Sequence, residues 1–381
     1  MQSLPPQKIC DVLLRSFLTG VRPLLPLVHV PSLLRRYESF WTRNAHGRAS
    51  SFQFSPTSRT SEQAFCCLLW AVLFCGAVAA SPALLSEAAV RANNRIAFLS
   101  RLRSKVNKSL DLCRQDRLPT LDGLIASLLA QECDLSVDPI IDMPPFISRS
   151  IHAAMTLGLH REAALSEFPD SEAEMGRRVW HHLLDLEVTA FFEPGNSLHL
   201  ISSKATYDTR LPGEQGDAAL AMGSKDHCQK APAPHSSTAN TSSAMILARG
   251  QHETSRMLRR VIDTCYSGHQ SPEVTELKRL ASEMEEFDRK IDGLIRRLAV
   301  RGIPECGQIS SQLLGANPLV HSGLYVDNPR EPTVLNAFCR IRLNMMKFNV
   351  STLFNRQFLN HSRHAKFPGI WNRYVAPIYN M

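Results

Sequence analysis

The sequence GLHREAALSEFPDSEAEMGRRVW, residues 158–180, is rich in charged residues. Its last part begins an apolar pattern with helical spacing. Within it, Ser171 and Glu174 match a capping box, in which a serine hydroxyl and a glutamate carboxylate satisfy amides at a helix start. Behind the box, apolar residues recur every three or four positions, at Met175, Val179, Leu183, Leu186 and Ala190. This spacing predicts an amphipathic helix that buries one stripe.

The charged residues of this stretch allow two interpretations, an active site or the polar seam of a helical scaffold. An active site needs a nucleophile or a set of metal ligands that converge on one point, and no such set is recognisable in the sequence. A structural role accounts for the pairs Glu174 with Arg178 and His181 with Asp185, because residues four apart on a helix are neighbours. We therefore predict that these side chains brace packed helices.

Helical spacing also dominates elsewhere, whereas period-2 alternation and hairpin turns are scarce. Thr120 is placed to cap one helix, and Gly158 lies where another ends. The predicted helices cover 12–18, 31–41, 121–135, 146–159, 171–190, 243–262, 274–298 and 331–358. In the last of these, the recurring apolar positions are Leu335, Phe338, Ile341, Met345, Phe348 and Phe358. The predicted fold class is all-α, a multi-helix array.

The composition changes between Gly213 and Ser243, where Gly, Ser, Ala, Pro and Lys replace large apolar residues. Such a segment cannot form a core, so 213–243 is predicted to be a flexible linker or surface loop. It separates an N-terminal helical part, 1–212, from a C-terminal helical part, 244–381, which we expect to pack on the first.

The segment Ala64–Ala80, AFCCLLWAVLFCGAVAA, contains no charged residue. A membrane span needs about 20 apolar residues, so this segment is at the short end of the range. Because Ser81 and Pro82 follow it and no basic cluster lies close to it, we favour a buried core helix. A membrane anchor is the alternative.

The formal net charge of +8 suits a surface that tolerates polyanions, without establishing nucleic-acid binding. Basic residues concentrate between residues 91 and 117, which indicates a solvated helix face or, alternatively, a surface for acidic partners. The cysteines form no Cys-x-x-Cys pair, and several lie in apolar stretches. They are predicted to be small buried hydrophobes in a reducing compartment, in agreement with an N-terminus that lacks a secretory-signal pattern.

Motifs of common enzyme classes are absent from the sequence. The adjacent His181 and His182 point about 100° apart on a helix, and neither they nor His252 belong to a His-Glu-x-x-His zinc motif. Aspartate-rich magnesium clusters, phosphate-binding glycine loops and the Gly-x-Ser-x-Gly elbow are also missing. The chain is therefore predicted not to be an enzyme, and an all-α enzyme with an internal small-molecule pocket is the alternative.

Four motifs, in this order, resemble those of the middle homology region of fungal zinc-cluster transcription factors. The first is RPLLPLVHVPSLL, in which Pro23, Pro26, His29, Pro31 and Ser32 match the family pattern. The others are Ala154 with Leu157–Arg161, then Glu174, Met175 and Arg177–Trp180 with Asp185 downstream, and finally Leu211 with Pro212. Together the motifs span about residues 20 to 212, and Gly176 and His181 stand where the family has an arginine and a tryptophan.

The resemblance implies an all-helical regulatory domain of a transcription regulator, which acts in the nucleus and commonly controls metabolic or secondary-metabolite genes. It also implies that the motif residues brace the central helices and perform no chemistry: His160, Arg161, Glu174, Arg177, Arg178, Trp180 and Asp185. The implied partners are other transcription regulators, a second copy of the chain, or a small-molecule effector held in an apolar cavity, and no membrane.

The DNA-binding module of this family needs six cysteines, arranged so that two zinc ions share their thiolates. This sequence has no such arrangement of cysteines. The resemblance therefore implies no zinc or other cofactor and no DNA-binding residue in this chain. DNA is expected to be reached indirectly or through a missing N-terminal module, which was either lost or clipped by the gene model.

Overall fold

The computed structural model describes residues 4–45, 56–87, 94–113, 119–135, 143–190, 206–217, 220–221, 241–266, 273–300 and 333–356. The secondary-structure elements in these ranges are helices, which confirms the predicted all-α class. The described residues form two compact units. The first contains those up to Leu183 and those between 206 and 221, whereas the second contains Leu184–Ala190 and those from Thr241 onward.

The first unit begins with α1 (Gln7–Ser16), which runs directly into the π-helical turn η1 (Phe17–Val21). It continues with α2 (Val30–Ala45), α3 (Pro56–Ala79), α4 (Pro82–Glu87), α5 (Arg95–Leu112), α6 (Leu121–Leu135), α7 (Met143–Thr156) and α8 (Glu162–Leu165). It ends within α9 (Asp170–Ala190), whose last turns belong to the second unit.

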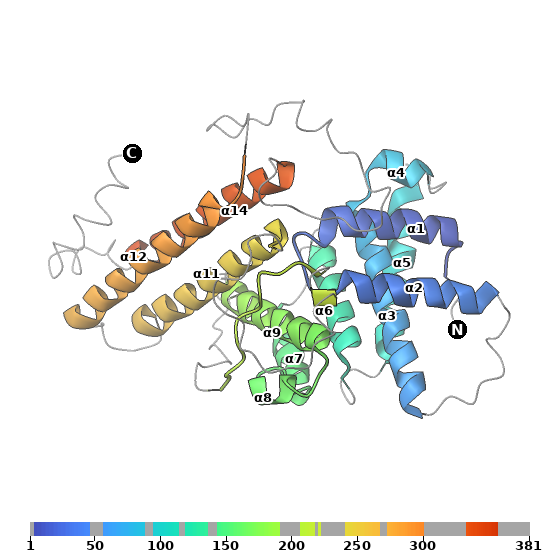
Figure 1. The fold of residues 1–381 in the computed structure, drawn as a ribbon, viewed down its shortest axis with the longest axis horizontal. Coiled ribbons are helices and arrows are strands. Elements are labelled where there is room, and N and C mark those ends of the chain that lie inside the picture. The colour runs from blue at the N-terminus through green and yellow to red at the C-terminus, as the bar shows by residue number, and fades with distance from the viewer. Residues whose placement is uncertain are drawn as a thin grey trace. The chain divides into compact units, whose positions relative to one another are not determined.

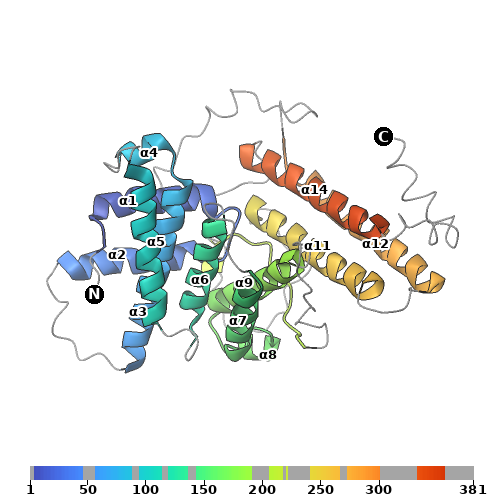
Figure 2. The ribbon, with the colours of Figure 1, turned by 180° about the vertical axis from the view of Figure 1, so that it is seen from behind.

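The central helix of the first unit is α3, which packs against α1, η1, α5 and α6 (Figures 1 and 2). Its residues from Cys67 to Cys75 are at most 5% exposed. By length and composition α3 could cross a membrane, yet most of its apolar stretch is buried inside the protein. The structure therefore agrees with the predicted core helix. Cys10, Cys67 and Cys75 are buried free thiols, also as predicted, and burial raises the pKa of the Cys10 thiol to about 12.

Helix ends in the first unit follow the sequence signals in part. Thr120 Oγ1 accepts a hydrogen bond from the Gly123 amide at 3.2 Å and caps α6, as predicted. α7 begins at Met143, so Pro144 and Pro145 lie in its first turn and not before it. Proline is tolerated there because first-turn amides have no partner within the helix. Beyond α7, Gly158 adopts φ +77°, the left-handed region in which other residues are strained.

The capping box predicted at Ser171 and Glu174 is wrong. α9 begins at Asp170, so Ser171 already lies inside the first turn. Glu174 is buried, and its carboxylate accepts hydrogen bonds from Arg178 and from the Gly213 amide. The local pattern assigns the Glu174 side chain to the helix start, but in the fold this side chain makes a tertiary contact with Gly213 instead.

The second unit consists of the last turns of α9 with α11 (Ser243–Cys265), α12 (Val274–Arg296) and α14 (Val334–Arg356). The three long helices pack against one another (Figure 1). Buried Arg259 of α11 holds the last turns of α9, because its Nη2 donates to Glu187 Oε2 and to the Leu184 carbonyl, each at 2.6 Å.

α14 is apolar on two opposite faces. Its buried face carries Leu343, Met346, Val350, Leu353 and Phe354, none more than 7% exposed. Of the recurring positions identified from periodicity, Phe338, Ile341, Met345 and Phe348 are instead 44–62% exposed, and Leu335 is half-buried. Phe358 lies outside the described residues. The most regular apolar pattern of α14 is therefore a stripe that the described part of the fold does not bury.

The predicted division into 1–212, 213–243 and 244–381 stays a prediction. The contacts divide the chain inside α9, between Leu183 and Leu184. Of the predicted linker, the structure describes residues 213–217, 220–221 and 241–243, whereas 218–219 and 222–240 lie outside the described residues. Asp217, inside the predicted linker, is only 4% exposed.

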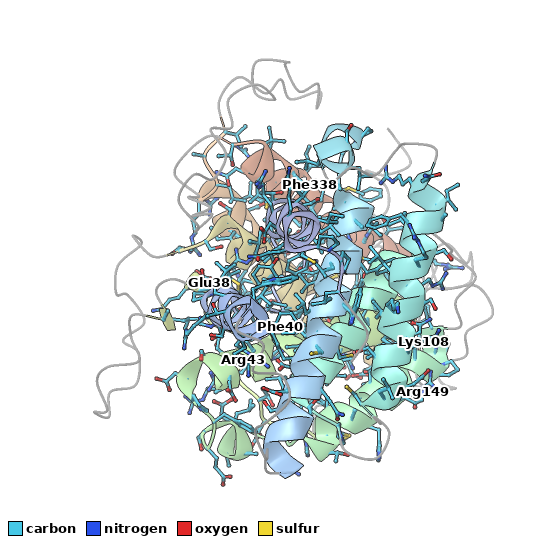
Figure 3. The ribbon with its side chains drawn as sticks, turned by 90° about the vertical axis from the view of Figure 1, so that its right-hand side faces the viewer. Glu38, Phe40, Arg43, Lys108, Arg149 and Phe338 are labelled. Carbon is cyan, nitrogen blue, oxygen red and sulfur yellow. The ribbon has the colours of Figure 1, made fainter. Side chains whose placement is uncertain are left out.

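The basic run between residues 91 and 117 falls largely on α5. Arg101 and Lys108 are exposed, and Lys108 lies on the outer side of the helix (Figure 3). Arg91, Arg114 and Arg117 lie outside the described residues. The exposed positions suit a solvated helix face, and binding of an acidic partner stays a prediction.

Candidate functional site

A buried ionic network in the first unit connects α9 with two loop segments, residues 22–30 and 206–217. Its centre is Asp217. The Oδ1 atom of Asp217 accepts a hydrogen bond from Arg178 Nη1 at 2.8 Å. The Oδ2 atom lies 2.9 Å from Arg22 Nη2 and accepts a hydrogen bond from the Val30 amide at 3.1 Å. Val30 and Asp217 are 187 residues apart in the sequence, so the network joins distant parts of the chain.

Arg178 is the most connected residue of the network and is 2% exposed. Its Nε donates to Glu174 Oε1 at 3.3 Å, and its Nη1 also donates to the Pro26 carbonyl at 3.3 Å. Its Nη2 donates to the Gln215 carbonyl at 3.4 Å. The planar guanidinium group suits this role, because its donors point to several acceptors at once. The two carboxylates offset the cost of removing its charge from water.

Glu174 and Arg177 extend the network towards solvent. Glu174 Oε1 accepts from the Gly213 amide at 2.9 Å, and Glu174 Oε2 lies 3.5 Å from Arg177 Nη1. Arg177 Nη2 donates to Glu162 Oε1 at 2.6 Å. Glu162 Oε2 in turn accepts from the Arg210 amide at 3.0 Å. The segment that ends in Asp217 is thus bonded to α8 and α9 through its backbone.

An aromatic group adjoins the network at Trp180, which is fully buried. The ring centroids of Trp180 and His160 are 5.9 Å apart, and those of Trp180 and Tyr207 are 5.7 Å apart. Nearby, Thr209 Oγ1 donates to the Leu159 carbonyl at 2.6 Å. These contacts hold the turn after α7 against the segment 206–217.

His29 joins the network through both ring nitrogens. Nδ1 lies 2.8 Å from Ser32 Oγ, and Nε2 lies 3.2 Å from the Asp217 carbonyl oxygen. Burial lowers the pKa of His29, because the charged imidazolium is poorly solvated there. The ring is therefore held neutral at physiological pH.

The pKa values of the two buried carboxyl groups shift in opposite directions. Burial raises the pKa of Glu174, and Arg178 and Arg177 offset only part of this. Burial alone would also raise the pKa of Asp217, but Arg178, Arg22 and the hydrogen bonds to its carboxylate outweigh burial and lower it. Asp217 is therefore the stable anion of the network.

When the pH is lowered from about 5 to about 3, the free energy of unfolding of an Asp217→Asn variant is expected to fall less than that of the wild-type chain. The lowered pKa of Asp217 contributes stability above its unfolded-state pKa, and that stability is lost as the pH falls through the folded-state pKa. Chemical unfolding at a series of pH values measures how the free energy of unfolding changes with pH. The variant should be less stable at neutral pH, because Arg22 and Arg178 lose their shared anion.

A Glu174→Gln variant supplies a control of opposite sign. The raised pKa of Glu174 contributes stability that is present below the unfolded-state pKa and lost as the pH rises through the folded-state pKa. Removing this contribution should steepen the loss of stability on acidification. Equal slopes in the three proteins would contradict the assigned pKa directions.

The structure brings most of the predicted bracing residues together. Glu174, Arg177 and Arg178 lie in the ionic network, and the Glu174–Arg178 pair predicted from i, i+4 spacing is present at 3.3 Å. His160 and Trp180 lie in the aromatic group beside it. The two remaining residues differ: Arg161 is exposed at the start of α8, and Asp185 belongs to the second unit.

Sequence reasoning missed Arg22, Glu162 and Asp217 as members of the network. Arg22 is the first residue of the stretch that carries the first family motif, directly before the matched Pro23, so its position offered a weak signal. Asp217 offered none, because it stands in a polar segment rich in glycine and alanine. Only the fold brings it next to Arg178 and Arg22.

An open hollow of about 680 Å³ lies against the outer side of the network and is lined in part by Glu162, Glu174, Arg177 and Arg210. Glu162 and Glu174 are both engaged by arginine side chains and backbone amides. These two lining carboxylates are therefore held by the network.

A second cavity, of about 430 Å³, lies in the second unit between the end of α9, α11 and α14. Leu258, Met346 and Leu353 supply apolar walls, and Asp185 and Arg342 are among its polar residues. Its volume is within the range of small-molecule sites. Asp185 thus lines a cavity, apart from the ionic network of the first unit.

In the part of the chain that the structure describes, no group of three or more histidine, cysteine, aspartate or glutamate side chains is placed to hold a metal ion. That the chain binds no cofactor stays a prediction.

The all-α fold and the buried ionic network define a helical scaffold. The chain matches the fungal specific transcription factor domain over residues 14–292 and belongs to that family. This confirms the resemblance drawn from the four motifs. It also confirms the prediction that the chain is not an enzyme, since the members of the family are transcription factors.

Three relatives illustrate the similarity. The chain is 34% identical to the transcription factor macR of Penicillium terrestre, over 94% of this chain and 41% of that protein. It is 33% identical to the transcription factor yanR of Aspergillus niger, over 84% of this chain and 38% of that protein. It is 27% identical to the pyriculol/pyriculariol biosynthesis cluster transcription factor 1 of Pyricularia oryzae, over 54% of this chain and 25% of that protein. The chain thus spans about two-fifths of the length of the first two relatives, and no solved structure matches it.

Proposed function

We propose that this chain is the regulatory region of a fungal transcription regulator, which acts in the nucleus and controls a set of metabolic or secondary-metabolite genes. The observation that carries the proposal is the family match over residues 14–292, which covers the network of Arg22, Arg178 and Asp217. The proposed gene set is supported by one relative, whose name assigns it to a biosynthesis cluster.

The proposed mechanism is interaction without chemistry. The network fixes the loop segments 22–30 and 206–217 against α9, and so presents a defined surface to other regulators. DNA would be contacted through a separate module or a partner. A small-molecule effector stays a prediction, and the cavity lined by Leu258 and Met346 offers it a suitable volume. Such an effector would act by favouring one conformation of the unit that binds it.

The test is a fusion of the 381-residue chain to an unrelated DNA-binding domain, expressed in a fungal host with a matching reporter gene. We expect reporter transcription to differ from that given by the DNA-binding domain alone, and a fluorescent fusion to accumulate in nuclei. Arg178→Ala should abolish the difference, because it removes the most connected residue of the network, whereas exposed Arg210→Ala should retain it. A reporter level equal to that of the DNA-binding domain alone would contradict the proposal.

A further inference from the structure

Two free thiols meet where the central helix α3 packs against α5 in the first unit (Figure 2). Cys67 lies on α3, and Cys113 is the C-cap residue of α5. The thiol of Cys67 donates a hydrogen bond to the sulfur of Cys113, and the hydroxyl of Ser109 donates one to the sulfur of Cys67. Because the Cys113 amide bonds to the Ser109 carbonyl, these two residues lie on the same face of α5. The sulfur of Cys67 therefore lies against the last turn of α5.

This contact brings two sulfur atoms close enough for a disulfide to form after a small movement. A disulfide requires neighbouring sulfur atoms on side chains that face each other, and thiols in hydrogen-bond contact meet this requirement. Cys113 stands at a helix end, so its backbone can adjust without breaking the hydrogen bonds of the helix interior. A bond between the two sulfur atoms would join the central helix of the unit to the end of α5.

The two thiols differ in exposure and in pKa. Cys113 is partly exposed, whereas Cys67 is fully buried. The hydrogen bond from Cys67 lowers the pKa of the Cys113 thiol, and burial offsets only part of this. The same hydrogen bond, together with burial, raises the pKa of the Cys67 thiol. Because the thiolate is the reactive form of cysteine, Cys113 is the thiol that reacts first with an oxidant in solution.

Cys66 is a matched neighbour of this pair. It directly precedes Cys67 on α3, and adjacent helical residues point about 100° apart. Burial raises the pKa of the Cys66 thiol, and the charge of Glu62 adds to this effect. The influence of Cys113 on Cys66 is electrostatic. Cys66 therefore distinguishes a requirement for the contact with Cys113 from a requirement for any thiol nearby.

We propose that Cys67 and Cys113 are a site of reversible oxidation, at which a peroxide converts the two thiols into a disulfide between α3 and α5. The Cys113 thiolate attacks one oxygen of hydrogen peroxide, the O–O bond breaks, and the hydroxide that leaves takes a proton from solvent. The Cys67 thiol then attacks the sulfur of the Cys113 sulfenic acid, the S–O bond breaks, and the leaving hydroxide takes the Cys67 proton. The two thiols lose two electrons, and one peroxide becomes two waters.

This modification goes beyond the proposed function and does not depend on it, because it concerns the thiol chemistry of the first unit alone. In a reducing compartment such a disulfide is transient and lasts while oxidant is present. It would hold the last turn of α5, which carries the exposed Lys108, against the central helix.

The test treats the reduced full chain with hydrogen peroxide, blocks the remaining thiols with N-ethylmaleimide and digests the chain with trypsin without reduction. Mass spectrometry is expected to find the peptide that contains Cys113 joined to the peptide that contains Cys67, and dithiothreitol should separate the two. Cys67→Ala and Cys113→Ala should each lose the joined peptide. The matched control Cys66→Ala should retain it, and fragmentation of the wild-type peptide between Cys66 and Cys67 assigns the bond independently of any variant.

Dimedone, which labels sulfenic acids, tests the order of the two steps. In Cys67→Ala the peroxide-treated chain should carry dimedone on Cys113, because the thiol that would displace the sulfenic acid oxygen is gone. In Cys113→Ala, dimedone should leave Cys67 unlabelled, because that thiol is buried and protonated. Labelling of Cys67 in the second variant would contradict the assigned order.

Four results would overturn the proposal: a wild-type chain that gives no joined peptide at any peroxide concentration, a joined peptide that persists in Cys67→Ala, a joined peptide that is lost in Cys66→Ala, or an oxidised chain that migrates as a covalent dimer on a non-reducing gel. The last result would show that the bond joins two copies. Circular dichroism under reducing conditions checks that each variant is folded as the wild type is.

Discussion

An Arg178→Ala variant is expected to lose about 3–5 kcal/mol of the free energy of unfolding of the first unit. The substitution leaves Asp217 and Glu174 buried without the guanidinium that they share. It also removes the donors to the carbonyl groups of Pro26 and Gln215. Urea unfolding followed by circular dichroism measures the loss.

The matched control for this variant is Arg210→Ala. The Arg210 side chain is 73% exposed, and its Nε lies 3.8 Å from Glu162 Oε1. Such surface pairs contribute about 0.5 kcal/mol, so the control should unfold almost as the wild type does. Equal stability of Arg178→Ala and Arg210→Ala would show that the network does not brace the fold.

A Gly76→Ala variant is expected to destabilise the first unit by about 3 kcal/mol or more. Gly76 lies on α3 where α1 passes, and a Cβ atom there would lie 2.0 Å from the Leu13 carbonyl oxygen and 2.8 Å from its carbonyl carbon. Both of these are backbone atoms, so relief requires α1 to move away from the central helix. A fall in the unfolding temperature, measured by calorimetry, checks this expectation.

Gly293→Ala on α12 is the control for the same chemical change. Apart from the glycine itself, its chain neighbours and the backbone of α12, no atom lies within 4 Å of the position that the new Cβ would occupy. Alanine is a better helix former than glycine, so this variant should gain about 0.5–1 kcal/mol in the second unit. A destabilising effect of similar size at both positions would contradict the close approach at Gly76.

The sequence predicted the helical class and the pairing of Glu174 with Arg178 on α9 because both depend on local spacing. Apolar residues three or four apart indicate a helix wherever they occur, and Glu174 and Arg178 are neighbours on any helix. Thr120 and Gly158 were recognised for the same reason. Each of these features is decided by residues within two turns of one another.

Features that depend on distant contacts were not predictable from spacing. Asp217 has no local pattern, and it is brought to Arg22 and Arg178 only by the tertiary fold. The Glu174 carboxylate satisfies the sequence rule for a capping box but bonds to Gly213 instead. On α14, two faces have helical spacing, and nothing local shows which of them is buried.

The position of Asp217 bears on how the first unit can be produced in isolation. The family motifs end at Leu211 and Pro212, so a fragment that stops there is an obvious choice. Such a fragment would keep Arg22 and Arg178 but lack the anion that neutralises them both. Two cations would then lie together in a dry interior, and water would enter to solvate them. A useful recombinant fragment must therefore extend through Asp217, five residues beyond the point at which the recognisable sequence ends.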